Sequence, residues 1–144
     1  PELTNQTISE ARMARPPAKE LTERELEIMQ VFWKRGPLAV ADVQADLKEA
    51  GLDRAYTTVA TLVRILADKG FLEQVNQERP FIFRPARSYE DVSGKLLTDL
   101  VERVFQGSRE KLLVRLLDQK RLSAKERAAL EQVLKGRDKP ETKQ

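Results

Sequence analysis

One stretch of this chain decides its expected fold: Tyr56–Gly70, with the sequence YTTVATLVRILADKG. At about 100° per residue its larger apolar side chains share one helical face, and these are Val59, Leu62, Val63 and Leu66. The opposite face carries small or polar residues, namely Thr57, Ala60, Thr61, Arg64 and Asp68. This outer face lacks the long Glu and Lys side chains that usually cover a solvated helix. The stretch therefore predicts an amphipathic helix whose polar side is short and carries an arginine.

A helix with such an outer face suits the major groove of DNA. Small hydroxyl side chains allow close approach, since Ser and Thr can bond base edges and Arg can bond guanine or phosphate. The alternative is an ordinary amphipathic helix with its polar side in water, and the helix alone gives the two interpretations similar weight. The flanking segments favour the DNA interpretation.

The segments on either side of this helix complete a recognisable order. A Gly36-Pro37 break and a short helical run, 42–50, precede it. After it, Gly70 is a stop signal, and two β-prone runs, 71–75 and 81–84, flank a turn. Helix, turn, helix and a hairpin with a basic tip is the order of a winged helix. The expected fold class is therefore mainly α with a small β hairpin.

An earlier helix is expected to begin at Thr22, where a capping box has Glu25 reaching back. Gly36 ends that helix. Glu23, Glu25 and Glu27 indicate a charge bias in the first turn and a solvated face, not a catalytic pair. The core face of this helix is expected to comprise Leu26, Met29, Val31, Phe32 and Trp33.

Composition excludes several classes of function. The 144 residues suffice for one domain, or a small domain with an accessory segment. The net charge is only +3, so a nucleic-acid surface would need local clustering of cations. The chain has 0 cysteines and 0 histidines, which removes thiol chemistry and nearly every zinc or copper site. Glycine motifs that bind phosphate are also absent. We therefore expect no enzyme, no cofactor and no bound metal.

The two ends of the chain are expected to be tails. Residues 1–20 form a mobile N-terminal tail with a Pro16-Pro17 break, and residues 137–144 form a polar tail. No run of about 18 apolar residues occurs, so no membrane insertion is expected. The N-terminus also lacks the apolar region of a secretory signal, which makes the cytoplasm the expected location.

Between the tails, the sequence divides into a winged-helix DNA-binding domain, 21–87, and a helical dimerisation domain, 88–136. Ser88, Ser108 and Ser123 each open a helix in the second domain, and Gly107 and Gly136 are stop signals.

These helices carry a broad apolar surface and too few residues to bury it alone. They either fold back on the first domain or pair with a second copy. The second alternative is preferred, because symmetric homodimers are common and span two DNA half-sites. The residues expected in the dimer interface are Leu97, Leu100, Val101, Val104, Leu113, Leu116, Leu117, Leu130, Val133 and Leu134.

The expected DNA contacts fall into three groups. The major-groove residues are Thr57, Thr58, Thr61 and Arg64. Phosphate contacts where the helix begins are assigned to Arg54 and Tyr56, and backbone or minor-groove contacts of the hairpin to Arg79 and Arg84. The alternative is a winged-helix module that binds protein without specific DNA binding. The modest net charge and the acidic residues Asp53 and Asp68 near the proposed DNA face favour that alternative.

Seven segments between Leu21 and about Gly136 follow one another in a distinctive order, and they are 21–33, Gly36-Pro37, 55–62, Lys69-Gly70, 79–85, 105–108 and Leu122-Ser123. Together they resemble the penicillinase repressor family, also called the BlaI/MecI/CopY family. The resemblance implies a winged-helix repressor that binds operator dyads on double-stranded DNA as a homodimer, with the C-terminal helices for dimerisation. In resistance members of the family, a membrane sensor protease signals β-lactam and the repressor is cut in its C-terminal segment. The resemblance thus also implies a regulatory protease as a partner.

Two departures from the family pattern concern the signal. The copper-sensing members carry a Cys-rich motif, and this chain has no cysteine. The cut bond of the resistance members precedes a phenylalanine, whereas the matching pair here is Arg115-Leu116. The resemblance therefore supports the repressor architecture more than it supports any one signal.

Overall fold

The computed structural model describes residues 20–119 and 121–137. Both predicted tails lie outside the described residues, apart from Glu20 and Arg137. The chain divides into two compact units, an N-terminal unit of residues 1–93 and a C-terminal unit of residues 94–144. None of the helices in the described ranges is both long and apolar enough to cross a lipid bilayer.

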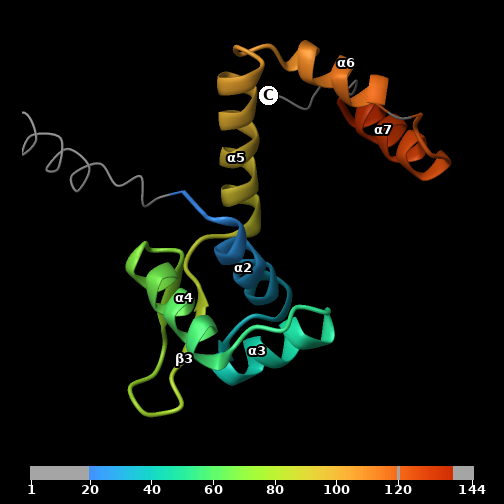
Figure 1. The fold of residues 1–144 in the computed structure, drawn as a ribbon. Coiled ribbons are helices and arrows are strands. Elements are labelled where there is room, and N and C mark those ends of the chain that lie inside the picture. Colours follow the sequence, from blue (N-terminus) through green and yellow to red (C-terminus); the bar gives the residue numbers. More distant parts are fainter. Residues whose placement is uncertain (1–19, 120, 138–144) are drawn as a thin grey trace, which may run out of the picture. The chain divides into compact units, whose positions relative to one another are not determined.

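The N-terminal unit is a winged helix, as predicted, with a three-stranded antiparallel sheet beside its helices (Figure 1). Its elements in chain order are α2 (Glu23–Arg35), β1 (Leu38–Ala39), α3 (Val40–Glu49), α4 (Tyr56–Asp68), β2 (Leu72–Gln74) and β3 (Ile82–Pro85), followed by the first turn of α5 (Tyr89–Val104). The recognition-type helix and the hairpin therefore stand where the sequence pattern placed them.

The sheet has the order β1-β3-β2. β2 and β3 form the predicted hairpin, with Gln74 opposite Phe83. β1 pairs with the other edge of β3, where Leu38 lies opposite Phe83. The sequence did not predict β1, because two residues are too short a run to show the period of a strand.

One apolar core holds the unit together. α4 contributes Val59, Val63 and Leu66, each at most 1% exposed, which confirms three of its four predicted core positions. The fourth, Leu62, is half-buried against that core. The fully assembled core consists of Ile28, Met29, Phe32, Leu38, Val43, Leu47, Val59, Val63, Leu66, Phe71, Leu72, Phe83 and Val92.

Trp33 lies at the edge of this core and is half-buried. Its indole N–H donates a hydrogen bond of 2.9 Å to the carbonyl of Arg87. Its ring meets Tyr89 edge-on, with 5.3 Å between the centroids. The side chain thus ties α2 to the first turn of α5, and its polar atom is satisfied as burial requires.

The start of α2 confirms the predicted capping box. The Glu25 amide donates to Thr22 Oγ1 at 3.1 Å, and the Thr22 amide donates to Glu25 Oε1 at 3.0 Å. The predicted solvated face is wrong, however, for two of its three glutamates. Glu25 is only 3% exposed and pairs with Lys69, while Glu27 is half-buried and pairs with Arg54. Both cations come from segments far along the chain, which a local pattern does not reveal.

The C-terminal unit comprises the rest of α5 with α6 (Arg109–Gln119) and α7 (Ala124–Arg137). The predicted helix starts are confirmed, because Ser108 Oγ accepts from the Lys111 amide and Ser123 forms a capping box with Glu126. The predicted stop at Gly107 lies three residues after the last residue of α5, Val104; Gly107 has a φ of 83°, and its amide donates to the carbonyl of Val101 at 2.9 Å. The predicted stop at Gly136 is wrong by a small margin, because α7 continues to Arg137, within the usual fraying of a helix end.

Candidate nucleic-acid interface

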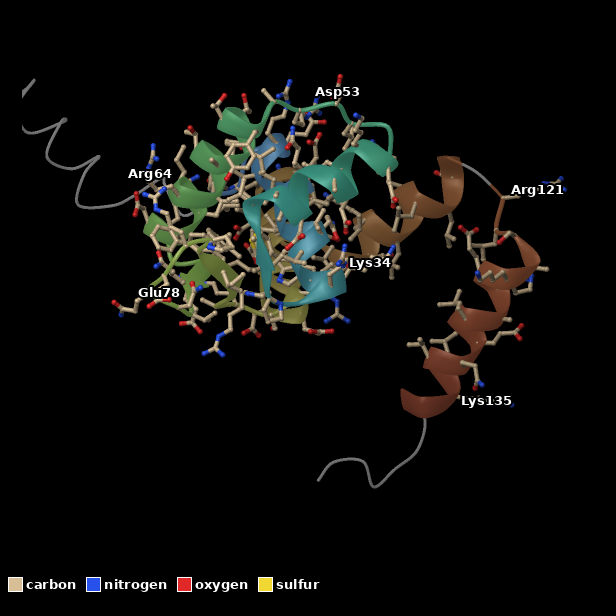
Figure 2. All side chains as sticks on the ribbon, turned by 90° about the horizontal axis from the view of Figure 1, so that it is seen from below. Lys34, Asp53, Arg64, Glu78, Arg121 and Lys135 are labelled. Carbon is tan, nitrogen blue, oxygen red and sulfur yellow. The ribbon has the colours of Figure 1, made fainter. Side chains whose placement is uncertain are left out.

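α4 presents the polar face that its sequence predicted. The side chains of Thr57, Thr58, Thr61 and Arg64 are exposed, while the apolar side of the helix is buried. Figure 2 shows Arg64 projecting outward from α4. Asp68 is exposed on the last turn. The helix therefore offers a surface of short hydroxyl side chains and one arginine that neighbouring elements do not cover.

The helix ends of α4 have different chemistry. Ala55 caps the start without a side-chain hydrogen bond, and its carbonyl accepts from the Val59 amide at 3.0 Å. At the far end, Gly70 has a φ of 88°, and the Phe71 amide returns to the carbonyl of Leu66 at 2.9 Å. This closure is typical of a Schellman motif, which confirms the predicted stop at Gly70.

Arg54 and Tyr56 stand where α4 begins. Tyr56 is 51% exposed. Arg54 is half-buried, and its guanidinium bonds both carboxylate oxygens of Glu27 at 3.0 and 3.1 Å. A phosphate that reached Arg54 would have to compete with that carboxylate.

The hairpin loop is built around Asn76. Its side-chain amide donates to the carbonyls of Glu78 and Pro80 at 2.9 and 3.0 Å, and its Oδ1 accepts from the Ile82 amide at 2.8 Å. Asparagine often closes turns in this way, because its side chain mimics the backbone. The sequence marked this segment as a turn but did not single out Asn76 as its organiser.

The two hairpin arginines differ in their surroundings. Arg79 is exposed and lies over the ring of Phe81, 5.1 Å from its centroid. Arg84 is exposed but pairs with Glu73 across the hairpin, with its Nε donating at 2.6 Å. In Figure 2 the neighbouring loop residue Glu78 also projects outward.

The four predicted DNA-binding arginines thus separate into two pairs. Within the described residues, Arg64 and Arg79 make no ion pair with a carboxylate, whereas Arg54 and Arg84 each make one. An exposed arginine without an internal carboxylate keeps its charge available for phosphate or guanine. Arg64 and Arg79 are therefore the better-placed cations for a nucleic acid.

Among residues 20–119 and 121–137 no group of three or more metal-ligating side chains could hold an ion.

The apolar side chains predicted to form a dimer interface are mostly uncovered. Val101 differs, because it is only 7% exposed and is thus already buried in the single chain. The other predicted positions are each at least 39% exposed, and they are Leu97, Leu100, Val104, Leu113, Leu116, Leu117, Leu130, Val133 and Leu134.

Comparison with known proteins gives consistent matches. A sequence model of the family described as penicillinase repressor matches residues 21–136. The transcriptional regulator BlaI of Mycobacterium tuberculosis (strain ATCC 25618 / H37Rv) is 32% identical over 116 residues, which cover 79% of this chain and 82% of that protein. The penicillinase repressor of Bacillus licheniformis is 24% identical over 115 residues, covering 80% of this chain and 89% of the relative.

Among solved structures, the DNA binding domain of the repressor BlaI is similar over 51% of this chain and 89% of its own length, with 26% identity and a TM-score of 0.45. The family match includes both the winged helix and the three C-terminal helices, and it is joined by a relative with 32% identity across most of both chains. This chain belongs to the penicillinase repressor family.

Proposed function

We propose that this chain is a sequence-specific DNA-binding transcriptional repressor that acts as a homodimer on an operator dyad. The observation that carries the proposal is the exposed threonine and arginine face of α4. Membership in the penicillinase repressor family supports it, as does the similarity to a BlaI transcriptional regulator and to a penicillinase repressor.

The chemistry of that face suits direct reading of bases. A major groove about 12 Å wide admits a helix, and short side chains let its backbone approach the base edges. Thr57, Thr58 and Thr61 can donate to or accept from base edges, and the threonine methyl groups can contact thymine. Arg64 can bond guanine in a bidentate manner. These four residues are the proposed specificity determinants.

Positioning on the backbone is assigned to other side chains. Arg79 at the exposed hairpin loop would contact phosphate or the minor groove, and Tyr56 would contact phosphate where α4 begins. Arg84 is assigned a weaker role of the same kind, because it already pairs with Glu73. Arg54 is also paired, with Glu27 of α2.

The homodimer is supported by the uncovered apolar face of the C-terminal helices. A symmetric dimer would bury this face and present two winged helices to two half-sites of an operator. Relief of repression by a regulatory protease is consistent with the exposed Arg115-Leu116 pair in α6, although this pair lies inside a helix.

A salt titration tests DNA binding. Affinity for a duplex selected by the chain from a random library should fall steeply with salt, by a slope near −0.9 per neutralised phosphate. Random duplexes of equal length serve as the control and should bind more weakly. A flat salt response, or equal affinity for selected and random duplexes, would instead support the module that binds protein.

A further inference from the structure

Helix α4 is held at both ends by carboxylates of α2. Before its start, Arg54 Nη2 bonds Glu27 Oε1 and Oε2 at 3.1 and 3.0 Å, and Arg54 Nε bonds Oε1 at 3.3 Å. After its end, Lys69 Nζ lies 2.7 Å from Glu25 Oε1. One helix thus supplies an anion to each end of the proposed recognition helix.

The Arg54 anchor is the more directional of the two. Its planar guanidinium meets the carboxylate in a fork, which fixes orientation as well as distance. The Arg54 carbonyl also accepts from Gln44 Nε2 of α3 at 3.0 Å. A single residue therefore links the segment before α4 to both α2 and α3.

Apolar packing alone would not give the same precision. The buried face of α4 is formed by Val59, Val63 and Leu66, and burial of such side chains is favourable without being directional. A hydrogen-bonded ion pair adds a restraint on angle that such burial lacks. Base readout tolerates only about 0.5 Å and 10–20° of error in the placement of contacting side chains. A directional anchor at the helix start supplies that precision.

We propose that Glu27, acting through Arg54, is a positioning residue for α4, and that sequence specificity depends on it although it contacts no base. The specificity part of this inference rests on the proposed function. Arg54 then serves chiefly inside the protein, and its expected phosphate contact is secondary.

The test uses the full chain with Glu27→Gln, which removes the charge at constant size, and Arg54→Lys, which keeps the charge but loses the fork. Arg35→Gln is the matched control, because Arg35 forms its ion pair with Asp46, between α2 and α3. Binding is measured, at several salt concentrations, to a random duplex and to one selected by the wild-type chain. Amide exchange of Val59 and Val63 is measured without DNA.

Both variants should lose about tenfold in affinity for the selected duplex, as expected for one degraded base contact. Random-duplex affinity and the salt slope should stay near wild type. Exchange at Val59, the first amide bonded within α4, should accelerate more than exchange at mid-helix Val63. Arg35→Gln should change none of these.

Three outcomes would overturn the inference. Tighter random binding and a steeper salt slope in Glu27→Gln would show that Glu27 merely masks a phosphate-binding arginine. Full specificity in Arg54→Lys would show that only the charge matters. Equal acceleration at Val59 and Val63 would show a general loss of stability. If wild type selects no duplex, the proposed function fails, and the exchange measurement still decides whether Glu27 positions α4.

Discussion

The two units of this chain treat their apolar side chains in opposite ways. In the described part of the N-terminal unit, the large apolar side chains left exposed are Tyr56, Val75 and Tyr89, and most of the others pack into or against one core. In the described part of the C-terminal unit Val101 is buried, whereas a larger set is exposed: Leu96, Leu97, Leu100, Val104, Leu113, Val114, Leu116, Leu117, Leu130, Val133 and Leu134.

This difference shows that a helix can form without its apolar face being buried in the same chain. The C-terminal helices have proper caps, at Ser108 and Ser123, so local signals are sufficient to define where they begin. Their apolar faces nevertheless lack cover within the single chain. The N-terminal unit closes its own core and should fold independently, whereas the C-terminal unit should depend on a partner surface.

The largest expected effect comes from Leu116→Glu, which places a charge on the uncovered face of α6. A fully buried leucine contributes about 1.5–3 kcal/mol, and an unpaired buried charge costs more than that burial loses. We expect a monomer at micromolar concentration by sedimentation. Affinity for the selected duplex should fall about 10²–10⁴-fold, because a single winged-helix domain lacks the effective-concentration gain of two linked ones.

Lys111→Glu is the matched control, since it introduces the same residue on the polar side of the same helix. It should leave the dimer intact. The N-terminal unit should stay folded in both variants. A Leu116→Glu chain that remains dimeric would place the interface elsewhere, and a monomer that binds the dyad normally would disprove the role of dimerisation.

The next largest effect concerns the stability of the N-terminal unit. Glu25→Gln removes the charge from a buried pair with Lys69, and hydrogen bonds to charged groups contribute about 1.5–3 kcal/mol. The free energy of unfolding of the N-terminal unit should fall by about that amount. Glu73→Gln, which breaks the exposed pair with Arg84, should cost only about 0–1 kcal/mol in the same denaturant titration. Equal losses would show that burial adds nothing to the Glu25 pair.

The same glutamate predicts a pH dependence. Burial alone would raise the pKa of Glu25, but hydrogen bonds from Lys69 and Thr22 and the charge of Lys69 lower that pKa below its ordinary value. The stabilisation is therefore complete above the ordinary pKa of glutamate, about 4.3, and is lost as pH falls through the lower folded-state pKa. The stability difference between wild type and Glu25→Gln should shrink over that interval, and a constant difference would contradict this assignment.

Local periodicity was sufficient to predict much of this fold. The apolar face of α4 and the glycine at its end follow from residues within one helix, and the structure confirms both. The partners of Glu25 and Glu27 could not be predicted, because Lys69 and Arg54 lie 44 and 27 positions away. Such pairs form only after the helices pack, so a sequence pattern shows charges but not which carboxylate each cation meets.

The candidate site was predicted to a similar degree. Exposure of Thr57, Thr61 and Arg64 follows from helical phase alone. The internal ion pairs of Arg54 and Arg84 do not, because they depend on tertiary contacts. The sequence also could not predict that Asn76 organises the hairpin loop, since the conformation of a five-residue turn is not determined by its composition.

A smaller effect separates base readout from backbone positioning. Arg64→Ala and Thr61→Ala should each lower the ratio of specific to non-specific affinity, since they remove base-edge contacts. The loss of discrimination free energy should be about 1–3 kcal/mol for each variant. Arg79→Ala should weaken selected and random duplexes alike, because a backbone contact carries little sequence information. Competition binding against random DNA measures the ratio. An unchanged ratio in Arg64→Ala would show that the outer face of α4 is wrongly assigned.

The smallest effect is expected from Gly94→Ala, at the first residue of the C-terminal unit and inside α5. Beyond the adjacent residues and the backbone of its own helix, no atom would meet the added Cβ within 4 Å, and alanine favours a helix interior over glycine by about 0.5–1 kcal/mol. Because this unit has little core of its own, helix propensity should count for more of its stability, and amide exchange in α5 should slow. Gly51→Ala is the matched control: its surroundings are equally open, but its φ of 89° strains any L side chain, so that variant should destabilise the N-terminal unit. If Gly94→Ala leaves exchange in α5 unchanged, then packing rather than propensity holds this helix, and the contrast between the two units is weaker than their exposed surfaces indicate.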